Sequence, residues 1–254
     1  MMFFRSLAAM LPLLLLSLPP PPAMAASLRI ETINGPPWGF VGSDGQPTGM
    51  MYEIGSRIAQ EAGFSYTNAL VPYARTGFDI ENGNADFILR FGSEQMARGA
   101  VAVATIVTMP VILIGPKGTH YKSLRELHGK TVGVVRSSSY VGNFDSDGAI
   151  KKYAVNDYVM MATMLSMRRL DGGVGASAGL YYGAYMAGVP RDQLGEPLVL
   201  GHNDFVLFFS KRTASPDTLK ALKAAVDKLS ASGEIRKIVN KYNNAAENPD
   251  QKRR

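Results

Sequence analysis

Short apolar runs alternate with segments of helical spacing along most of the chain. Apolar residues that recur every three or four positions predict helices at Met50–Ala62, Ser123–Leu127, Ala162–Arg169, Leu180–Ala187, Pro216–Ser230 and Gly233–Tyr242. Runs rich in β-branched and aromatic residues predict strands at Leu28–Ile33, Phe87–Phe91, Val101–Ile106, Val111–Ile114, Thr131–Val135 and Phe205–Ser210. Because strands and helices alternate, we predict the α/β class with largely parallel sheet.

The first 25 residues have the features of an export signal. Arg5 supplies a positive charge, Leu7–Leu18 is an apolar run, and Ala23–Ala25 fits the cleavage pattern of small residues. A membrane anchor is the alternative, but the run is shorter than the roughly 20 residues that span a bilayer, and Pro19–Pro22 follows it. We therefore predict a signal peptide that is cleaved near Ala25 and a mature chain in the periplasm.

Composition and spacing argue against several classes of chemistry. The chain contains no cysteine, and its net charge of +6 is scattered without the basic stripe typical of nucleic-acid binding. His120, His128 and His202 are isolated and lack the spacing of a zinc or iron site. Ser137–Ser139 lacks the Gly-x-Ser-x-Gly frame of a nucleophilic serine. We therefore expect no metal, no cofactor, no nucleic-acid partner and no enzymatic activity.

Several segments occur in an order that matches a known family. They are, in chain order, IETINGPPWGFVGSDGQPTGMMYEIGSRIAQEAG, VPYARTGFDIENGNADFIL, Arg98 twelve residues after Asp86, SLRELHGKTVGVVRSSSY, MLSMRRLDGGVGA and FVLFFSKRTASPDTLKALKAAVDKLSASGEIRKIVNKY. This order resembles the bacterial extracellular solute-binding proteins of family three, the polar-amino-acid-binding type, over nearly the whole mature chain. The resemblance implies the two-lobed periplasmic-binding-protein fold of type II with two hinge strands.

The resemblance also implies a function. It predicts a monomeric periplasmic protein that captures a small polar molecule by hinge closure and delivers it to the permease of an ABC transporter. The expected ligand is an amino acid or a related organic acid that bears a carboxylate. Two alternatives stay open: an exported lyase or dehydratase on the same fold, and the ligand-sensing subunit of a membrane receptor. Permease and ATPase genes beside its own gene would favour uptake.

In the family, the terminal helices return to the first lobe, so the chain must cross between lobes twice. We predict that residues 26–107 and 206–244 form lobe 1 and that residues 113–200 form lobe 2. Short hinge strands at 108–112 and 201–205 are expected to join the lobes, and residues 245–254 to form a flexible tail.

Arg98 is the leading candidate for ligand binding. In the family, the matching arginine grips the ligand carboxylate, and a planar guanidinium can do so in bidentate fashion. By itself, Arg98 also fits a solvated helix residue. Ser93 and Ser138 take the positions that complete a carboxylate cradle in the family. Ser137–Ser139 follows a strand and is expected to open a helix, where Ser138 and Ser139 either bind an anion or only cap that helix.

Aromatic and further basic residues complete the expected site. Trp38 follows the first strand in a Pro/Gly loop and is either core or cleft wall, while Tyr73 falls where the family places a ring. Arg75 and Arg90 are further candidates. Because Arg90 lies in an apolar strand, its charge requires either the cleft or a carboxylate partner, for which Glu53 is the candidate.

The sequence departs from the family at one informative position. Amino-acid-binding members place an aspartate there for the ligand's ammonium, whereas this chain has Ala176 and Ser177. Asp171 is assigned to a structural turn, and Asp204 or Glu53 could substitute for the absent acid. A carboxylate on the ligand is therefore better supported than an ammonium group.

Overall fold

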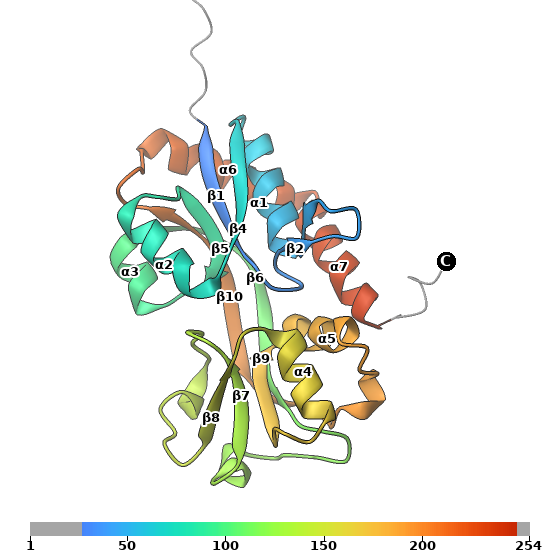
Figure 1. Ribbon diagram of the computed structural model, residues 1–254. Helices are drawn as coiled ribbons and strands as arrows, with labels where there is room; N and C mark the ends of the chain where they lie inside the picture. Colours follow the sequence, from blue (N-terminus) through green and yellow to red (C-terminus); the bar gives the residue numbers. More distant parts are fainter. Residues whose placement is uncertain (1–26, 248–254) are drawn as a thin grey trace, which may run out of the picture.

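The computed structural model describes residues 27–247, which form two lobes stacked end to end (Figure 1). The predicted signal peptide and the last residues of the predicted tail lie outside the described residues. Strands are β1 Leu28–Ile33, β2 Phe40–Val41, β3 Pro47–Thr48, β4 Tyr66–Val71, β5 Phe87–Phe91, β6 Ala100–Ile114, β7 Thr131–Val135, β8 Lys151–Val155, β9 Gly172–Ala176 and β10 Leu198–Ser210. Helices are α1 Met50–Glu61, α2 Tyr73–Asn82, α3 Glu94–Gly99, α4 Tyr158–Ser166, α5 Ser177–Met186, α6 Pro216–Ala231 and α7 Glu234–Glu247. Short 3-10 turns are η1 Leu124–Leu127, η2 Gly142–Phe144 and η3 Arg191–Gln193.

The sheet runs through both lobes in the order β4-β1-β5-β10-β6-β9-β7-β8. In lobe 1, β1 pairs in parallel with β4 and β5, and in lobe 2, β7 pairs in parallel with β8 and β9. The long strands β6 and β10 pair antiparallel and extend into both lobes, as Figure 1 shows. The α/β class and the two-lobed fold predicted from the sequence are confirmed.

Strands β6 and β10 alone connect the two parallel groups of strands. Strand β5 pairs with Phe205–Phe209, and β9 pairs with Val111–Ile114, so Thr108–Pro110 and His202–Asp204 face only one another. This connection is the middle of two long strands and not a pair of short linkers. The eight strands consequently form one continuous ladder.

The sequence pattern split β6 into Val101–Ile106 and Val111–Ile114, on either side of a segment with Pro110, which cannot donate a ladder hydrogen bond. Proline is tolerated there because β10 is the only neighbouring strand at this position. Strands β4 and β8 were missed because their residues are largely polar and partly exposed, and β9 was missed because it is rich in glycine.

Helices cover the sheet through apolar faces that the spacing predicted. Helix α1 buries Met50, Ile54 and Ile58 against the core, and α6 buries Leu222 and Val226. Ser215 caps α6 by accepting a hydrogen bond from the Thr218 N–H group, and a proline follows at the first helical position. The closing helix pair is confirmed, although α7 continues to Glu247, beyond the predicted end at Tyr242 and into the expected tail.

The lobes also touch through an aromatic cluster on the side opposite α2 and β8. The ring of Tyr182 on α5 lies 5.9 Å from that of Phe40 and 5.8 Å from that of Tyr242 on α7, between centroids. Figure 1 shows α5 and α7 together at this side, with α2 and β8 at the other. This contact, with the strand pair, fixes where the two lobes meet.

Candidate ligand-binding site

A cavity of about 270 Å³ lies between the lobes. Residues at or beyond the carboxyl ends of β1, β4 and β5 line one side, and residues beyond the ends of β7 and β8 line the other. Parallel strands in α/β proteins characteristically place ligands at this end. The lining residues are Ile33, Asn34, Gly35, Pro36, Trp38, Pro72, Tyr73, Ala74, Phe91, Val135, Arg136, Ser138, Tyr140, Asn156, Asp157, Tyr158 and Phe205.

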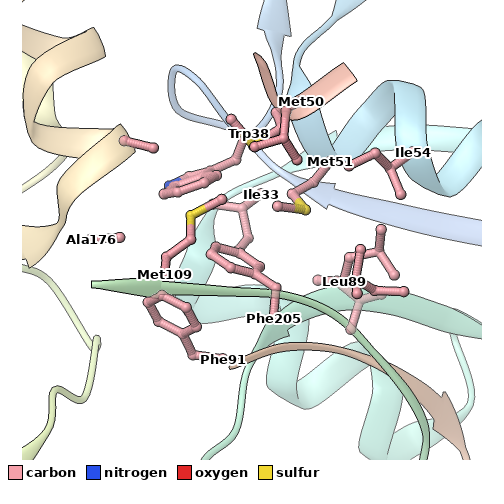
Figure 2. Packing of buried hydrophobic residues seen from close by; sticks show 14 of the residues in the cluster. Ile33, Trp38, Met50, Met51, Ile54, Leu89, Phe91, Met109, Ala176 and Phe205 are labelled. Carbon is pink, nitrogen blue, oxygen red and sulfur yellow. The ribbon is translucent and has the colours of Figure 1, made fainter. Parts of the chain in front are cut away.

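Closely packed, mutually tilted aromatic rings form one wall of the cavity. Trp38 lies 4.6 Å from Phe205 between ring centroids, and Phe205 lies 4.2 Å from Phe91. Figure 2 shows these rings together with Met109 from the connecting part of β6. Trp38 also meets Tyr158 of lobe 2 edge-on, with centroids 6.5 Å apart. Trp38 is therefore both a core residue and part of the cavity wall. The sequence alone had left these two roles as alternatives.

Two glycines hold the loop that carries Trp38. A Cβ atom on Gly39 would lie 2.5 Å from the Thr32 side chain, and one on Gly49 would lie 2.6 Å from the backbone of Gly39. Gly49 also has a φ of 129°, which other residues rarely adopt. The backbone of Trp38 then accepts a hydrogen bond from the Met51 N–H group at 2.9 Å. The loop is thus packed tightly at the start of α1.

Arg90 supports Tyr73 from behind and does not line the cavity. Its guanidinium donates to the Tyr73 hydroxyl at 2.7 Å and to Thr76 Oγ1 at 2.5 Å, and it lies 4.3 Å from the centre of the Tyr73 ring. Arg90 is 3% exposed, and no carboxylate pairs with it within the described chain. The expected partner, Glu53, instead accepts hydrogen bonds from Thr48, Lys241 and Tyr242, so that expectation is wrong.

Tyr158 packs directly against three glycines of β9 and α5, a contact that we call the glycine seat. Cβ atoms on Gly175, Gly179 and Gly183 would lie 2.3, 2.4 and 2.6 Å from atoms of Tyr158. The phenol oxygen accepts a hydrogen bond from the Ala176 N–H group at 3.3 Å. Ala176 is fully buried, so the position that holds an acid in the resembled family lies beneath a tyrosine here. Asp204, the other proposed substitute, accepts a hydrogen bond from Thr108 and does not line the cavity.

Tyr140 completes a group of phenols at the cavity. Its oxygen accepts a hydrogen bond from the Val135 N–H group at 2.9 Å. Burial is the largest cause that raises the pKa of both Tyr140 and Tyr158. The nearby Tyr73 phenol raises both pKa values further. These hydroxyls are therefore protonated at neutral pH.

Arg136 and Asp157 bring opposite charges to the lobe 2 side. Each follows a strand end, since Val135 of β7 lies opposite Val155 of β8 in parallel register. The Arg136 guanidinium makes no ion pair or hydrogen bond with any residue from 27 to 247. Asp157 caps α4 by accepting the Met160 N–H group at 2.8 Å through Oδ1. This cap starts α4 at Tyr158, four residues before the start predicted from the spacing.

Trp38, Tyr73 and Ser138 are the predicted site residues that line the cavity. Arg98 does not line it. Ser93 caps α3 by accepting a hydrogen bond from the Met96 N–H group, and Arg98 lies in the last turn of this short helix. The Arg98 side chain is largely exposed, with its Nε atom 3.9 Å from Glu81 Oε1. Arg75 also points to solvent and pairs with Asp79 at 2.6 Å. Ser139 is exposed outside the cavity.

The segment Ser137–Ser139 does not open a helix, in contrast to the expectation. Ser137 has a φ of 63°, and the Ser138 N–H group donates to the Val135 carbonyl, so the chain turns instead. The sequence reasoning missed Arg136, Tyr140, Asp157 and Tyr158. These four residues follow the carboxyl ends of β7 and β8. Because β8 was not predicted, there was no reason from the sequence to place Asp157 and Tyr158 beside the end of β7.

Two classes of feature are absent from the part of the chain that the structure describes. No cluster of three or more histidine, aspartate or glutamate side chains there could hold a metal ion. No helix of residues 27–247 is long and apolar enough to cross a membrane.

Comparison with known proteins gives concordant results. "Probable amino-acid-binding protein YxeM" of Bacillus subtilis (strain 168) is 25% identical over 211 residues, which cover 79% of this chain and 78% of YxeM. The amino acid ABC transporter substrate-binding protein AbpA from Streptococcus pneumoniae, solved bound to L-arginine, has a TM-score of 0.74 at 18% identity and covers 87% of this chain and 95% of its own. A histidine kinase sensor domain with similarity to periplasmic binding proteins has a TM-score of 0.73 at 15% identity, covering 86% and 96%. These structural likenesses show the fold.

A family model for the bacterial extracellular solute-binding proteins, family 3, matches residues 28–245. This match spans almost all of the described residues and includes both lobes and the cavity between them. The chain therefore belongs to the bacterial extracellular solute-binding proteins of family 3.

Proposed function

We propose that the protein is a periplasmic solute-binding protein that captures an amino acid or a related organic acid and delivers it to the permease of an ABC transporter. The position of the cavity carries this proposal, because side chains of both lobes line it beside the connecting strands. A ligand there contacts both lobes and favours their close approach. We place the hinge at residues 108–112 and 201–205, with the lobe boundaries that the sequence predicts.

We assign the ligand carboxylate to Arg136 and Ser138. The support is that Arg136 lines the cavity and that its guanidinium pairs with no carboxylate among the described residues. A carboxylate could receive two hydrogen bonds from this planar group, as well as one from the Ser138 hydroxyl. Arg98 is not assigned this role because it does not line the cavity and lies beside Glu81.

We assign a ligand ammonium group to Asp157. One oxygen of this carboxylate caps α4, and the side chain lines the cavity on the same sheet edge as Arg136. Opposite charges at adjacent strand ends suit the two charged groups of an α-amino acid. The similarity to YxeM and AbpA, whose names refer to amino acids, supports the same class of ligand for this chain.

The test is calorimetry with the best ligand from a thermal-shift screen of L-amino acids and small organic acids. Arg136→Ala should weaken binding by about 2–5 kcal/mol, some 30- to several-thousand-fold, because lobe closure desolvates the charge pair. Arg136→Lys should restore part of the affinity, since an ammonium cannot make the planar fork.

Arg98→Ala is the matched control. It removes the same charge from a position outside the cavity and should change binding by less than about 0.5 kcal/mol. The reverse pattern, with Arg98→Ala losing the ligand and Arg136→Ala keeping it, would move the carboxylate to α3 and contradict the assignment. Melting temperatures of all variants exclude unfolding as the cause.

A further inference from the structure

Tyr73 and Tyr140 line the cavity from opposite lobes, and each carries a hydroxyl group. The Tyr73 oxygen already accepts a hydrogen bond from Arg90 at 2.7 Å, and the Tyr140 oxygen accepts one from the Val135 N–H group at 2.9 Å. The Tyr158 oxygen accepts one from the Ala176 N–H group, and its own hydroxyl is engaged with Tyr140. A phenol whose oxygen is occupied by an N–H donor has its own proton left to offer. Tyr73 and Tyr140 therefore each have a hydroxyl proton available for a ligand, one from each lobe.

The charge behind Tyr73 strengthens this preference. Arg90 is 3% exposed and is held by Thr76, Tyr73 and a backbone carbonyl, with no carboxylate partner among residues 27–247. A buried cation without a counter-ion polarises the hydroxyl to which it donates and favours an electron-rich group beyond it. A ligand cation at the same place would be repelled.

The aromatic wall does not decide between these two kinds of ligand. Trp38, Phe91 and Phe205 would stack on a planar amide or urea group, but a guanidinium can also lie on such rings. Asp157 is the acid that lines the cavity, and the proposed function already assigns it to the α-ammonium group. The hydroxyl donors and Arg90 are thus the features that discriminate.

We propose that the cavity selects a ligand whose side group is a hydrogen-bond acceptor, received jointly by the hydroxyls of Tyr73 and Tyr140, and rejects a cationic side group. This inference rests on the proposed amino-acid function. It distinguishes this chain from AbpA, which was solved with L-arginine. Because one donor comes from each lobe, the acceptor also joins the lobes in the closed state.

The test uses L-citrulline and L-arginine, which have nearly the same shape but differ in that citrulline carries a carbonyl acceptor where arginine carries a cationic donor. Both are included in a panel with the protein L-amino acids. Trp38 is the only tryptophan of the chain and lines the cavity, so its fluorescence reports occupancy of this site. The wild type should bind L-citrulline at least about tenfold more tightly than L-arginine, the effect of one well-placed hydrogen bond.

Tyr73→Phe and Tyr140→Phe remove the hydroxyls and keep the rings, so each should bring the citrulline-to-arginine ratio towards one. Tyr153→Phe, at an exposed position of β8 away from the cavity, should leave the ratio unchanged. An unchanged ratio in both cavity variants, or a best ligand with a cationic or wholly apolar side chain, overturns this inference and leaves the proposed function standing. If no amino acid alters Trp38 fluorescence at millimolar concentration, the proposed function fails and this inference with it.

Discussion

The carboxyl group of Glu31 on β1 is buried, and its Oε2 atom has no hydrogen-bond partner. Burial, followed by the adjacent Asp79 carboxylate, raises the pKa of Glu31 to about 7. Asp79 itself is buried, but hydrogen bonds from Asn84, Arg75 and Glu31 outweigh that burial and lower its pKa. The pair therefore shares a proton below about pH 7, at the face of the helix whose first residue is Tyr73.

This pair predicts a fall in stability as the pH rises from about 4.5 to about 7. In that window the folded chain keeps a proton on Glu31 that the unfolded chain releases, so the free energy of unfolding decreases, by up to about 3 kcal/mol, and then levels. Glu31→Gln should remove this component, because its amide is neutral at every pH. Urea denaturation at pH 5 and pH 8 measures it, with exposed Glu94→Gln as the control. Parallel pH profiles for wild type and Glu31→Gln would show that the proton is not held there.

At the scale of elements, the glycines beneath Tyr158 lead us to predict that a glycine-to-alanine substitution in a helix destabilises the protein. Alanine normally stabilises a helix relative to glycine by about 1 kcal/mol. Gly55→Ala in α1 should do so, because the new Cβ atom would lie 3.6 Å from its nearest neighbour, a methyl group of Ile30. Gly179→Ala in α5 should instead destabilise by about 1–3 kcal/mol, because the new Cβ would meet the Tyr158 ring at 2.4 Å. Displacement of that ring should also weaken ligand binding. Thermal melts of both variants decide this, and equal shifts for the two would refute the glycine seat.

The same elements show what the sequence could and could not predict. The strands β1, β5 and β7 follow from runs of β-branched and aromatic residues, which are almost wholly buried. The helices α1, α6 and α7 follow from apolar periodicity, because each buries one face. The site was harder, because ligand contacts depend on where a helix starts. Ser93 starts α3 so that Arg98 turns away, whereas Asp157 starts α4 beside the cavity. The sequence alone cannot predict which of these helix starts lies beside the cavity, because that depends on which strand ends are neighbours in the sheet.

At the scale of the whole molecule, the lobes meet through the β6–β10 pair and through the contact of Tyr182 with Phe40 and Tyr242. Both lie away from the side that carries α2 and β8 (Figure 1). Motion about this combined axis would therefore open and close the cavity towards α2 and β8. Since the hydroxyl groups that line the cavity come from both lobes, a bound ligand would stabilise the closed arrangement.

The distance between α2 and β8 tests this central claim most directly. The chain has no cysteine, so Phe78→Cys and Tyr153→Cys, at side chains that are 59% and 45% exposed, can carry two spin labels without competing sites. We predict that a saturating ligand shortens and narrows the distance distribution in this background, and that added Arg136→Ala abolishes the change at the same ligand concentration. Identical distributions with and without a ligand that calorimetry shows to be bound would contradict capture of the ligand by closure of the two lobes.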